Sequence, residues 1–163
     1  MPVVESAPLL SATSYGAAKI AAEAVVRAIG VERGLPYTIV RPSALYGERE
    51  RPIQLVSTFL RLAQESGVLA LDGGGAQTRD LNYAGNVADA IVLLIDRGPA
   101  NAVYNIGSGE EVSISQLARM AVDSVYGESH RPTIISGPAR PGEEGRLTRR
   151  RLALRLSAAR LLG

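Results

Sequence analysis

The stretch that most constrains the fold is a predicted helix over Tyr15–Arg33, because both of its ends are marked in the sequence. Thr13 or Ser14 precedes it, and either hydroxyl can accept a hydrogen bond from a free backbone N–H of the first turn. Gly34 follows it and can adopt the left-handed conformation in which many helices end. Apolar residues recur inside the segment at helical spacing and form a stripe along one face.

A short strand is predicted directly after this helix, at residues 37–40, where β-branched side chains dominate. Arg41 and Pro42 follow it, and the residue before a proline favours extended backbone, so the strand runs into a loop. A helix, a short connection and a strand form the second half of a βαβ unit. We therefore expect an α/β fold with the remnant of a doubly wound, Rossmann-like parallel sheet, in which ligands bind at the carboxyl edge.

Composition favours a single soluble domain. The chain has 163 residues, 46% of them apolar, which is the length of one ordinary domain with a core of its own. It has no cysteine and one histidine, His130, which excludes disulfides, thiolate metal sites and histidine-rich metal clusters, so we assign no metal site. We find no signal sequence and no apolar run long enough to span a membrane, and we expect a cytoplasmic protein without membrane association.

Positive charge is concentrated at the C-terminal end of the chain. The net charge is +2, yet residues 131–163 hold eight arginines against Glu143 and Glu144. Nucleic acid or an anionic membrane can bind such a segment. We favour a solvated helix face and expect no nucleic-acid partner, because no aromatic side chains are interleaved with the arginines for bases to stack on.

Tyr15 and Lys19 are the residues in which the sequence most strongly suggests chemistry. Four positions apart on a helix, the phenol and the ammonium lie on one face, one turn from each other. A positive charge favours the phenolate, which is the form that accepts a proton as a general base. The spacing also arises by chance, as a half-buried ring beside a solvated lysine. Lys19 is, however, the only lysine among 18 basic residues, which favours a specific role.

A glycine-rich turn is predicted in the middle of the chain, at Gly73–Gly75, after a helix over residues 52–66 and a strand over residues 68–71. We favour a hairpin over a phosphate-binding loop, because no long helix opens at the glycines. Arg79 follows the turn, and its guanidinium suits the binding of two phosphate oxygens. The alternative is a weak surface ion pair between Arg79 and Asp80.

The remaining elements alternate between helix and strand. They are a helix over residues 87–95 capped by Asn86, a strand through Tyr104 and Ile106, a helix over residues 114–125 capped by Ser113, and a strand over residues 133–135.

Five phrases, in this order along the chain, resemble the NAD-dependent epimerase/dehydratase family, the extended short-chain dehydrogenases that act on nucleotide sugars. They are the Tyr-x-x-x-Lys helix, the strand ending in Arg-Pro with Leu-Tyr-Gly after it, Asp-Gly-Gly-Gly-Ala-Gln-Thr-Arg-Asp, Tyr-Asn-Ile-Gly-Ser-Gly, and Arg-Pro-Gly-Glu. Each phrase alone is weak, whereas the ordered set spans residues 11–145.

The resemblance implies an enzyme that takes a nucleotide-diphosphate sugar and passes hydride to NAD or NADP. Its tyrosine accepts the proton of a sugar hydroxyl, and its lysine assists the tyrosine and holds the nicotinamide ribose. The implied catalytic residues are Tyr15 and Lys19, the implied cofactor-binding residues are Tyr15, Lys19, Arg41 and Pro42, and the implied substrate-binding residues are Tyr46, Arg79, Arg140 and Glu143. In this scheme the arginines contact the diphosphate and the glutamate contacts a ribose hydroxyl.

Two departures from the family pattern shape the functional expectation. Too few residues precede Tyr15 for the glycine fingerprint that binds the dinucleotide, and Ala44 stands where many members have an asparagine that contacts the diphosphate. We expect residues 1–47 to be the C-terminal remnant of a Rossmann domain, and residues 48–163 to form a substrate-side region interleaved with late Rossmann elements. Such a C-terminal portion is expected to be inactive alone.

The alternative is a non-catalytic relict, which binds nucleotide sugars or self-associates. A sheet that lacks its first strands exposes unpaired edges, and a second copy of the chain can cover them. A homo-oligomer is therefore one of the expected partners.

Overall fold

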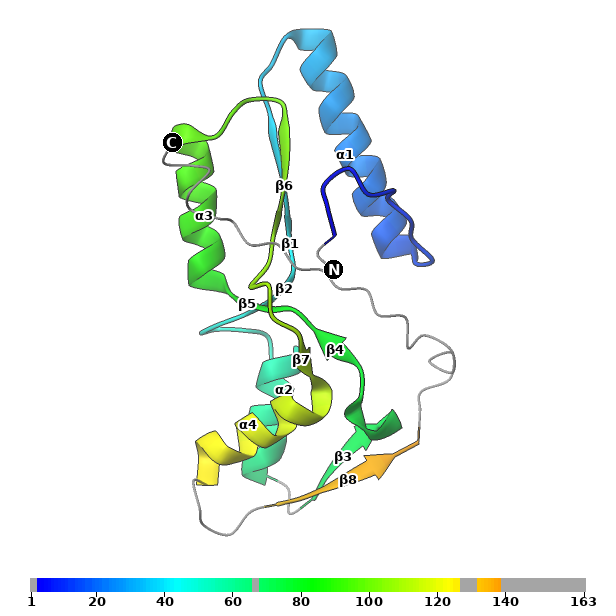
Figure 1. Ribbon diagram of the computed structural model, residues 1–163, viewed down its shortest axis with the longest axis vertical. Helices are drawn as coiled ribbons and strands as arrows, with labels where there is room; N and C mark the ends of the chain where they lie inside the picture. Colours follow the sequence, from blue (N-terminus) through cyan, green and yellow to red (C-terminus); the bar gives the residue numbers. More distant parts are fainter. Residues whose placement is uncertain (1–2, 66–67, 127–131, 139–163) are drawn as a thin grey trace.

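The computed structural model describes residues 3–65, 68–126 and 132–138, which form two parts joined end to end (Figure 1). The sheet part consists of α1 (Ser14–Arg33), β1 (Thr38–Pro42), α3 (Ala84–Arg97) and β6 (Ala102–Ile106). The helical part consists of α2 (Leu55–Glu65), β3 (Val68–Asp72), a 3-10 turn (Gly73–Gly75), β4 (Thr78–Arg79), β7 (Val112–Ser113), α4 (Ile114–Tyr126) and β8 (Thr133–Gly137). A third parallel pair, β2 (Ala44–Tyr46) with β5 (Leu81–Tyr83), lies where the two parts meet.

The sheet part confirms the predicted α/β architecture. β1 and β6 pair in parallel over their full length, and α3 lies in the crossover between them. Figure 1 shows α1 and α3 on opposite sides of this strand pair. The ends of α1 are as the sequence predicts: Thr13 Oγ1 accepts a hydrogen bond from Gly16 N at 3.2 Å, and Gly34 has φ +61°.

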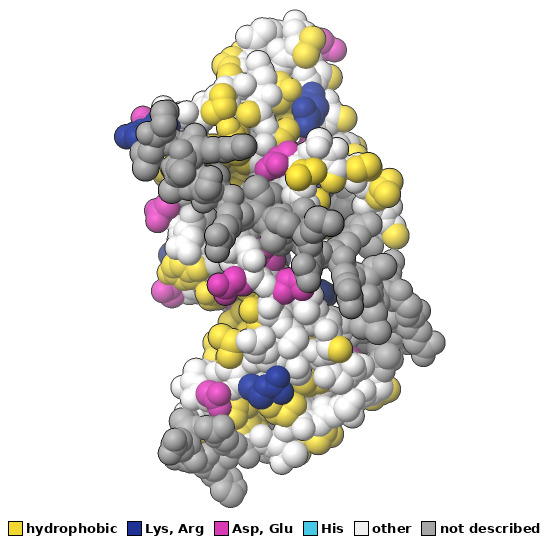
Figure 2. Space-filling model, in the orientation of Figure 1, with side chains coloured by type: hydrophobic (Ala, Val, Ile, Leu, Met, Phe, Trp, Pro, Cys, Tyr) yellow, Lys and Arg dark blue, Asp and Glu magenta, His cyan; other side chains and the backbone are white. Residues whose placement is uncertain are grey.

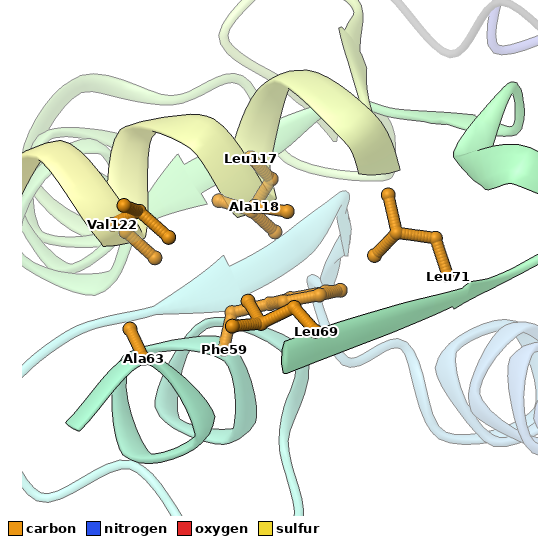
Figure 3. Packing of buried hydrophobic residues seen from close by; sticks show 8 residues of the cluster. Phe59, Ala63, Leu69, Leu71, Leu117, Ala118 and Val122 are labelled. Carbon is orange, nitrogen blue, oxygen red and sulfur yellow. The ribbon is translucent and has the colours of Figure 1, made fainter. Parts of the chain in front are cut away.

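The helical part holds the larger core. On β3, Leu69 and Leu71 alternate with exposed residues and so point to the same face of the strand. Figure 3 shows side chains of α4 meeting those of α2 and β3; the buried members of this cluster are Phe59, Ala63, Leu69, Leu71, Leu117, Ala118, Ala121 and Val122. The four from α4 recur at spacings of one, three and four, as expected for one face of an amphipathic helix.

The sheet part has a much smaller core and exposes more apolar surface. Its buried cluster has three members, Val87, Leu94 and Ile106. On α1, by contrast, Val25 is 56% exposed and Val31 is 81% exposed. Figure 2 shows hydrophobic side chains at the surface of this part of the molecule. A two-stranded sheet is marginally stable on its own, so the sheet part depends on the packing of α1 and α3 against its strands. These helices leave part of their own apolar surface exposed.

The glycine run does not form the predicted hairpin. β3 pairs in parallel with β8, and β4 pairs antiparallel with β7, so the strands before and after Gly73–Gly75 are not partners. Gly74 and Gly75 have φ +72° and +70°, which fits the preference of glycine for positive φ. A Cβ on Gly75 would also lie 2.8 Å from Ser115 N. The run therefore redirects the chain close against the start of α4.

Helix boundaries were predicted with mixed success. Ser113 Oγ accepts from Gln116 N at 3.1 Å, which confirms this residue as the cap of α4. The predicted cap at Asn86 is wrong, because α3 begins at Ala84 and the asparagine lies inside its first turn. α2 begins at Leu55 rather than near residue 52, because a turn precedes it in which Gln54 N donates to Arg51 O. Within the described ranges, no helix combines the length and the apolar character of a membrane span.

Candidate active site at the first turn of α1

Tyr15 and Lys19 lie together at the start of α1, as their spacing predicts. The Nζ atom of Lys19 is 5.5 Å from the centroid of the Tyr15 ring. An ammonium over an aromatic ring is attracted by the negative face of the π system, which holds the two groups close. Tyr15 is 73% exposed, so its hydroxyl is open to a ligand from solvent. The pair is thus assembled and accessible.

The N-terminal cap of α1 holds this first turn in place. Ser11 Oγ accepts from Thr13 N at 3.1 Å and donates to Thr13 O at 3.0 Å, while Thr13 caps the helix itself. A Cβ added to Gly16 would clash with Ser11 Oγ, at a separation of 2.1 Å. The capping loop thus folds back directly over the residue after Tyr15, and glycine leaves room for it.

Arg41, predicted to bind the cofactor, forms an ion pair with α1. Its Nε and Nη2 donate to the two carboxylate oxygens of Glu23 at 2.7 and 2.6 Å, and its Nη1 donates to Glu5 O at 3.0 Å. Both side chains of the pair are 17% exposed. Hydrogen bonding from Arg41 lowers the pKa of Glu23, and burial acts in the opposite direction without cancelling this effect. Pro42 lies at the exposed end of β1.

Asp80 connects the loops at the carboxyl ends of β1 and β6. Its Oδ1 accepts from Ser43 Oγ at 3.1 Å, from Ser108 N at 2.8 Å and from Ser108 Oγ at 2.9 Å. Its Oδ2 accepts from Gly109 N at 3.3 Å. The residue is 7% exposed. The alternative of a surface pair between Arg79 and Asp80 is therefore wrong, because the carboxylate is buried and bound by neutral donors.

Two of the predicted substrate residues, Arg79 and Tyr46, lie on strands and not on α1. Arg79 is exposed on β4, and its Nη1 donates to Thr78 O at 2.8 Å. Tyr46 ends β2, with its ring centroid 5.8 Å from that of Tyr83. Tyr83 donates to Glu48 Oε2 at 2.9 Å, and this hydrogen bond raises the pKa of Tyr83. In the described ranges no hydrogen bond or ion pair joins any of these groups to the α1 pair.

Two predicted substrate residues, Arg140 and Glu143, lie outside the described residues. Neither the ion pair of Glu23 nor the connecting role of Asp80 was predicted from the sequence. The sequence did contain a hint of the Glu23 ion pair. Glu23 is a carboxylate that interrupts the apolar stripe of a predicted helix, and the next predicted strand ends in an arginine. Asp80 had none, because its partners Ser43 and Ser108 become neighbours only when the strands pair.

Comparison with known proteins identifies the family. The family model described as NAD dependent epimerase/dehydratase matches residues 2–107. The chain belongs to this family. It is 31% identical over 121 residues to the dTDP-D-glucose 4,6-dehydratase of Homo sapiens, an alignment that covers 74% of this chain and 35% of that protein.

Solved structures of epimerases share the fold. The UDP-glucose 4-epimerase of Thermotoga maritima, solved with UDP-glucose, matches with a TM-score of 0.68 and 30% identity, over 78% of this chain and 41% of that one. The NAD complex of the UDP-glucose 4-epimerase of Thermus thermophilus matches with a TM-score of 0.74 and 25% identity, over 87% and 47%. The predicted family and its Rossmann-like α/β fold are thus confirmed, and NAD is the cofactor of the family's complete enzymes. The chain spans about a third of the human dehydratase and less than half of either epimerase.

The described residues of this epimerase/dehydratase family member include one group with the chemistry to contact part of NAD. Lys19 presents an exposed ammonium beside Tyr15, and an ammonium has three donors suited to the hydroxyls of a ribose. The pyrophosphate of a dinucleotide requires a glycine-rich turn between a parallel strand and a helix. No helix in the described ranges opens from such a turn. The described residues therefore include a donor group that suits a ribose, Lys19, and no turn of the kind that binds a pyrophosphate.

Replacing Glu23 by glutamine is expected to destabilise the chain by about 1 to 2 kcal/mol at pH 7, between the values for exposed and fully buried ion pairs. The folded state holds the pKa of Glu23 below its ordinary value of 4.5 and so binds fewer protons than the unfolded state. The stabilisation is therefore complete above about pH 4.5 and is lost as the pH falls through the folded pKa. Urea unfolding at pH 7 and at about pH 3.5 measures both effects.

Glu65 provides the matched control, because it pairs with Arg61 at 2.7 Å on the open surface of α2. Glu65→Gln is expected to change stability by no more than about 0.5 kcal/mol at either pH. Equal changes in the free energy of unfolding for the two substitutions would show that the Glu23–Arg41 pair contributes no more to stability than an exposed ion pair.

Proposed function

We propose that this chain is the C-terminal portion of an NAD-dependent nucleotide-sugar epimerase or dehydratase, with Tyr15 as the group that takes the proton of a sugar hydroxyl. The observation that carries the proposal is the position of Lys19 Nζ, 5.5 Å from the centre of an exposed Tyr15 ring at a capped helix start. Membership of the epimerase/dehydratase family supports the reaction class.

The roles of the pair follow from charge and position. A phenol becomes a base when a nearby cation stabilises its anion, and Lys19 is the cation that lies beside Tyr15. The cap at Thr13 stabilises the helix start that carries both residues, so their backbone positions are set before substrate binds. NAD, when bound, supplies the hydride chemistry. Removing the hydroxyl proton makes loss of hydride from the same carbon favourable.

Arg79 is proposed to anchor the diphosphate of the sugar nucleotide. Its guanidinium is exposed on β4 and bonded in the described structure to one backbone carbonyl, which leaves several N–H donors for phosphate oxygens. Arg140 is proposed for the same group, and Glu143 and Tyr46 for the nucleotide ribose and the sugar. Anchoring the substrate far from the reacting carbon would orient the sugar at Tyr15.

Calorimetric titration of the isolated chain with UDP-glucose and dTDP-glucose tests this proposal. We expect weak binding of at least one of them and no formation of NADH on addition of NAD, since the described residues do not suit the dinucleotide pyrophosphate. Arg79→Gln is expected to weaken binding about tenfold or more, because a charged hydrogen bond is lost. Arg97→Gln is the control, since Arg97 is also exposed but pairs with Asp96 on α3.

The titration also tests the alternative, in which the chain is a non-catalytic relict that self-associates. The exposed apolar residues of α1, such as Val25 and Val31, favour that alternative. A folded chain that gives no heat with either nucleotide sugar, and that scatters light as a dimer, would replace the proposed function by this one. Binding that is unchanged in Arg79→Gln would remove the diphosphate role of that residue.

A further inference from the structure

A cavity of about 400 Å³ lies in the region between α2, α4 and the start of α3. Its apolar lining includes Leu81 of β5, Val112 of β7 and Leu117 of α4. Tyr15, Lys19 and Arg79 do not line it, so it is separate from the catalytic pair and from the diphosphate anchor proposed above, whereas Tyr46, proposed there for the ribose or the sugar, is one of its lining residues. A volume of this size fits a small ligand of one or two rings.

Asn82 gives the cavity its one deeply buried polar group among the described lining residues. The residue is 5% exposed, and its carboxamide has no hydrogen-bond partner within the described part of the chain. Among the described residues, every fully buried side-chain nitrogen or oxygen has a hydrogen-bond partner. The amide atoms of Asn82 are therefore not sealed in protein, and they open into the cavity that the residue lines.

An unpartnered buried carboxamide defines the ligand chemistry. It presents a carbonyl acceptor and an NH₂ donor side by side toward the cavity, and neither atom has a partner in the described protein. A ligand that offers a donor next to an acceptor satisfies both atoms at once, as the edge of adenine does when it meets an asparagine. A cis-lactam, in which a ring N–H adjoins a ring C=O, has this pattern.

The walls of the cavity favour a flat, apolar ring. Leu117 and Ala121 come from the buried face of α4, and the rings of Tyr46 and Tyr83 also line the cavity, tilted at 57° to each other. Flat aromatic ligands gain from contact with aliphatic walls and from edge or face contact with such rings.

Charge excludes a phosphate. The described lining contains no lysine or arginine, and its one charged side chain is the carboxylate of Glu110. An anion would lose its hydration without gaining a cation here. The ligand is therefore neutral or cationic, unlike the nucleoside diphosphate of the proposed substrate.

From these observations we propose that the cavity is a second ligand site, which binds a planar lactam-containing heterocycle through the carboxamide of Asn82. The proposal does not depend on turnover, on NAD or on the diphosphate site. A peptide or lipid occupant is not favoured, because the deeply buried polar group of the cavity is a single amide.

The test uses 2-quinolinone as the probe and N-methyl-2-quinolinone as its matched partner, added to the ¹⁵N-labelled 163-residue chain. We expect 2-quinolinone to shift the NMR signals of the Asn82 side-chain amide and of the backbone around Ser108 and Ala121. The N-methyl compound has nearly the same shape without the donor and is expected to bind about tenfold more weakly.

Variants check the role of the amide. Asn82→Leu is expected to abolish the tenfold difference between the two probes, and Gln116→Leu, which removes an exposed carboxamide of α4 outside the cavity, is expected to keep it. Equal binding of the two probes to the unmodified chain would overturn the proposal, as would shifts confined to other regions or no shifts at all. The comparison of probes needs no variant, so it stands even if Asn82→Leu fails to fold.

Discussion

Leu69→Ala is expected to lower the free energy of unfolding by about 3 kcal/mol, within the range of about 2 to 5 kcal/mol for truncating a buried leucine. Leu69 has no exposed surface, and it is the largest side chain in the described structure to be fully enclosed. Figure 3 shows it beside Phe59 of α2, with the side chains of α4 above both. Alanine would leave a cavity that three elements must close together. Urea unfolding followed by circular dichroism measures the change.

Val68→Ala is the control, since Val68 is the neighbouring residue on β3 and is 49% exposed. It is expected to cost well under about 1 kcal/mol, because little apolar surface is lost there. A small loss for Leu69→Ala, similar to the control, would mean that the larger core does not limit stability. A loss of about 3 kcal/mol would be a large fraction of the whole stability of a domain this size.

Local features of the fold could be predicted from the sequence. Both ends of α1 were predictable because Thr13 and Gly34 act on backbone groups within one turn. The cap at Ser113 was predictable for the same reason. The prediction at Asn86 was wrong because it rested on the frequency of asparagine at caps, whereas the start of α3 is set by the end of β5.

Strand pairing could not be predicted, because it joins residues that are far apart in the sequence. β3 and β4 look like the arms of a hairpin, since a glycine run separates two short strands. In the structure the partner of β3 is β8, which follows α4, and the partner of β4 is β7, which precedes it. No local pattern around Gly73–Gly75 carries that information.

The same division holds for the site. Tyr15 and Lys19 could be placed together because helical spacing brings them to one face. The ion pair of Arg41 with Glu23 needed the packing of α1 on β1, and the contacts of Asp80 needed three strand ends to meet. Asn82 was missed because a polar residue on a short strand gives no sign of facing a cavity.

Asp80→Ala is expected to destabilise the chain by roughly 3 kcal/mol, because it leaves four half-buried donor contacts without an acceptor. The donors come from the loop after β1 and from the turn after β6, whereas Asp80 itself lies between β4 and β5. The carboxylate therefore ties the sheet part to the helical part. Asp89→Ala, on the exposed surface of α3, is the control and is expected to be nearly neutral.

The shape of the urea unfolding curve of Asp80→Ala shows whether the substitution destabilises only the loop around residue 80 or also uncouples the sheet part from the helical part. If Asp80 ties the two parts together, its loss separates their transitions in urea, and the sheet part unfolds first because its buried cluster has three residues. A double-mutant cycle with Ser108→Ala is expected to give a coupling energy of about 1 to 2 kcal/mol, since Ser108 donates to Asp80 through both N and Oγ. A single sharp transition with additive losses would mean that the carboxylate stabilises its own loop and no more.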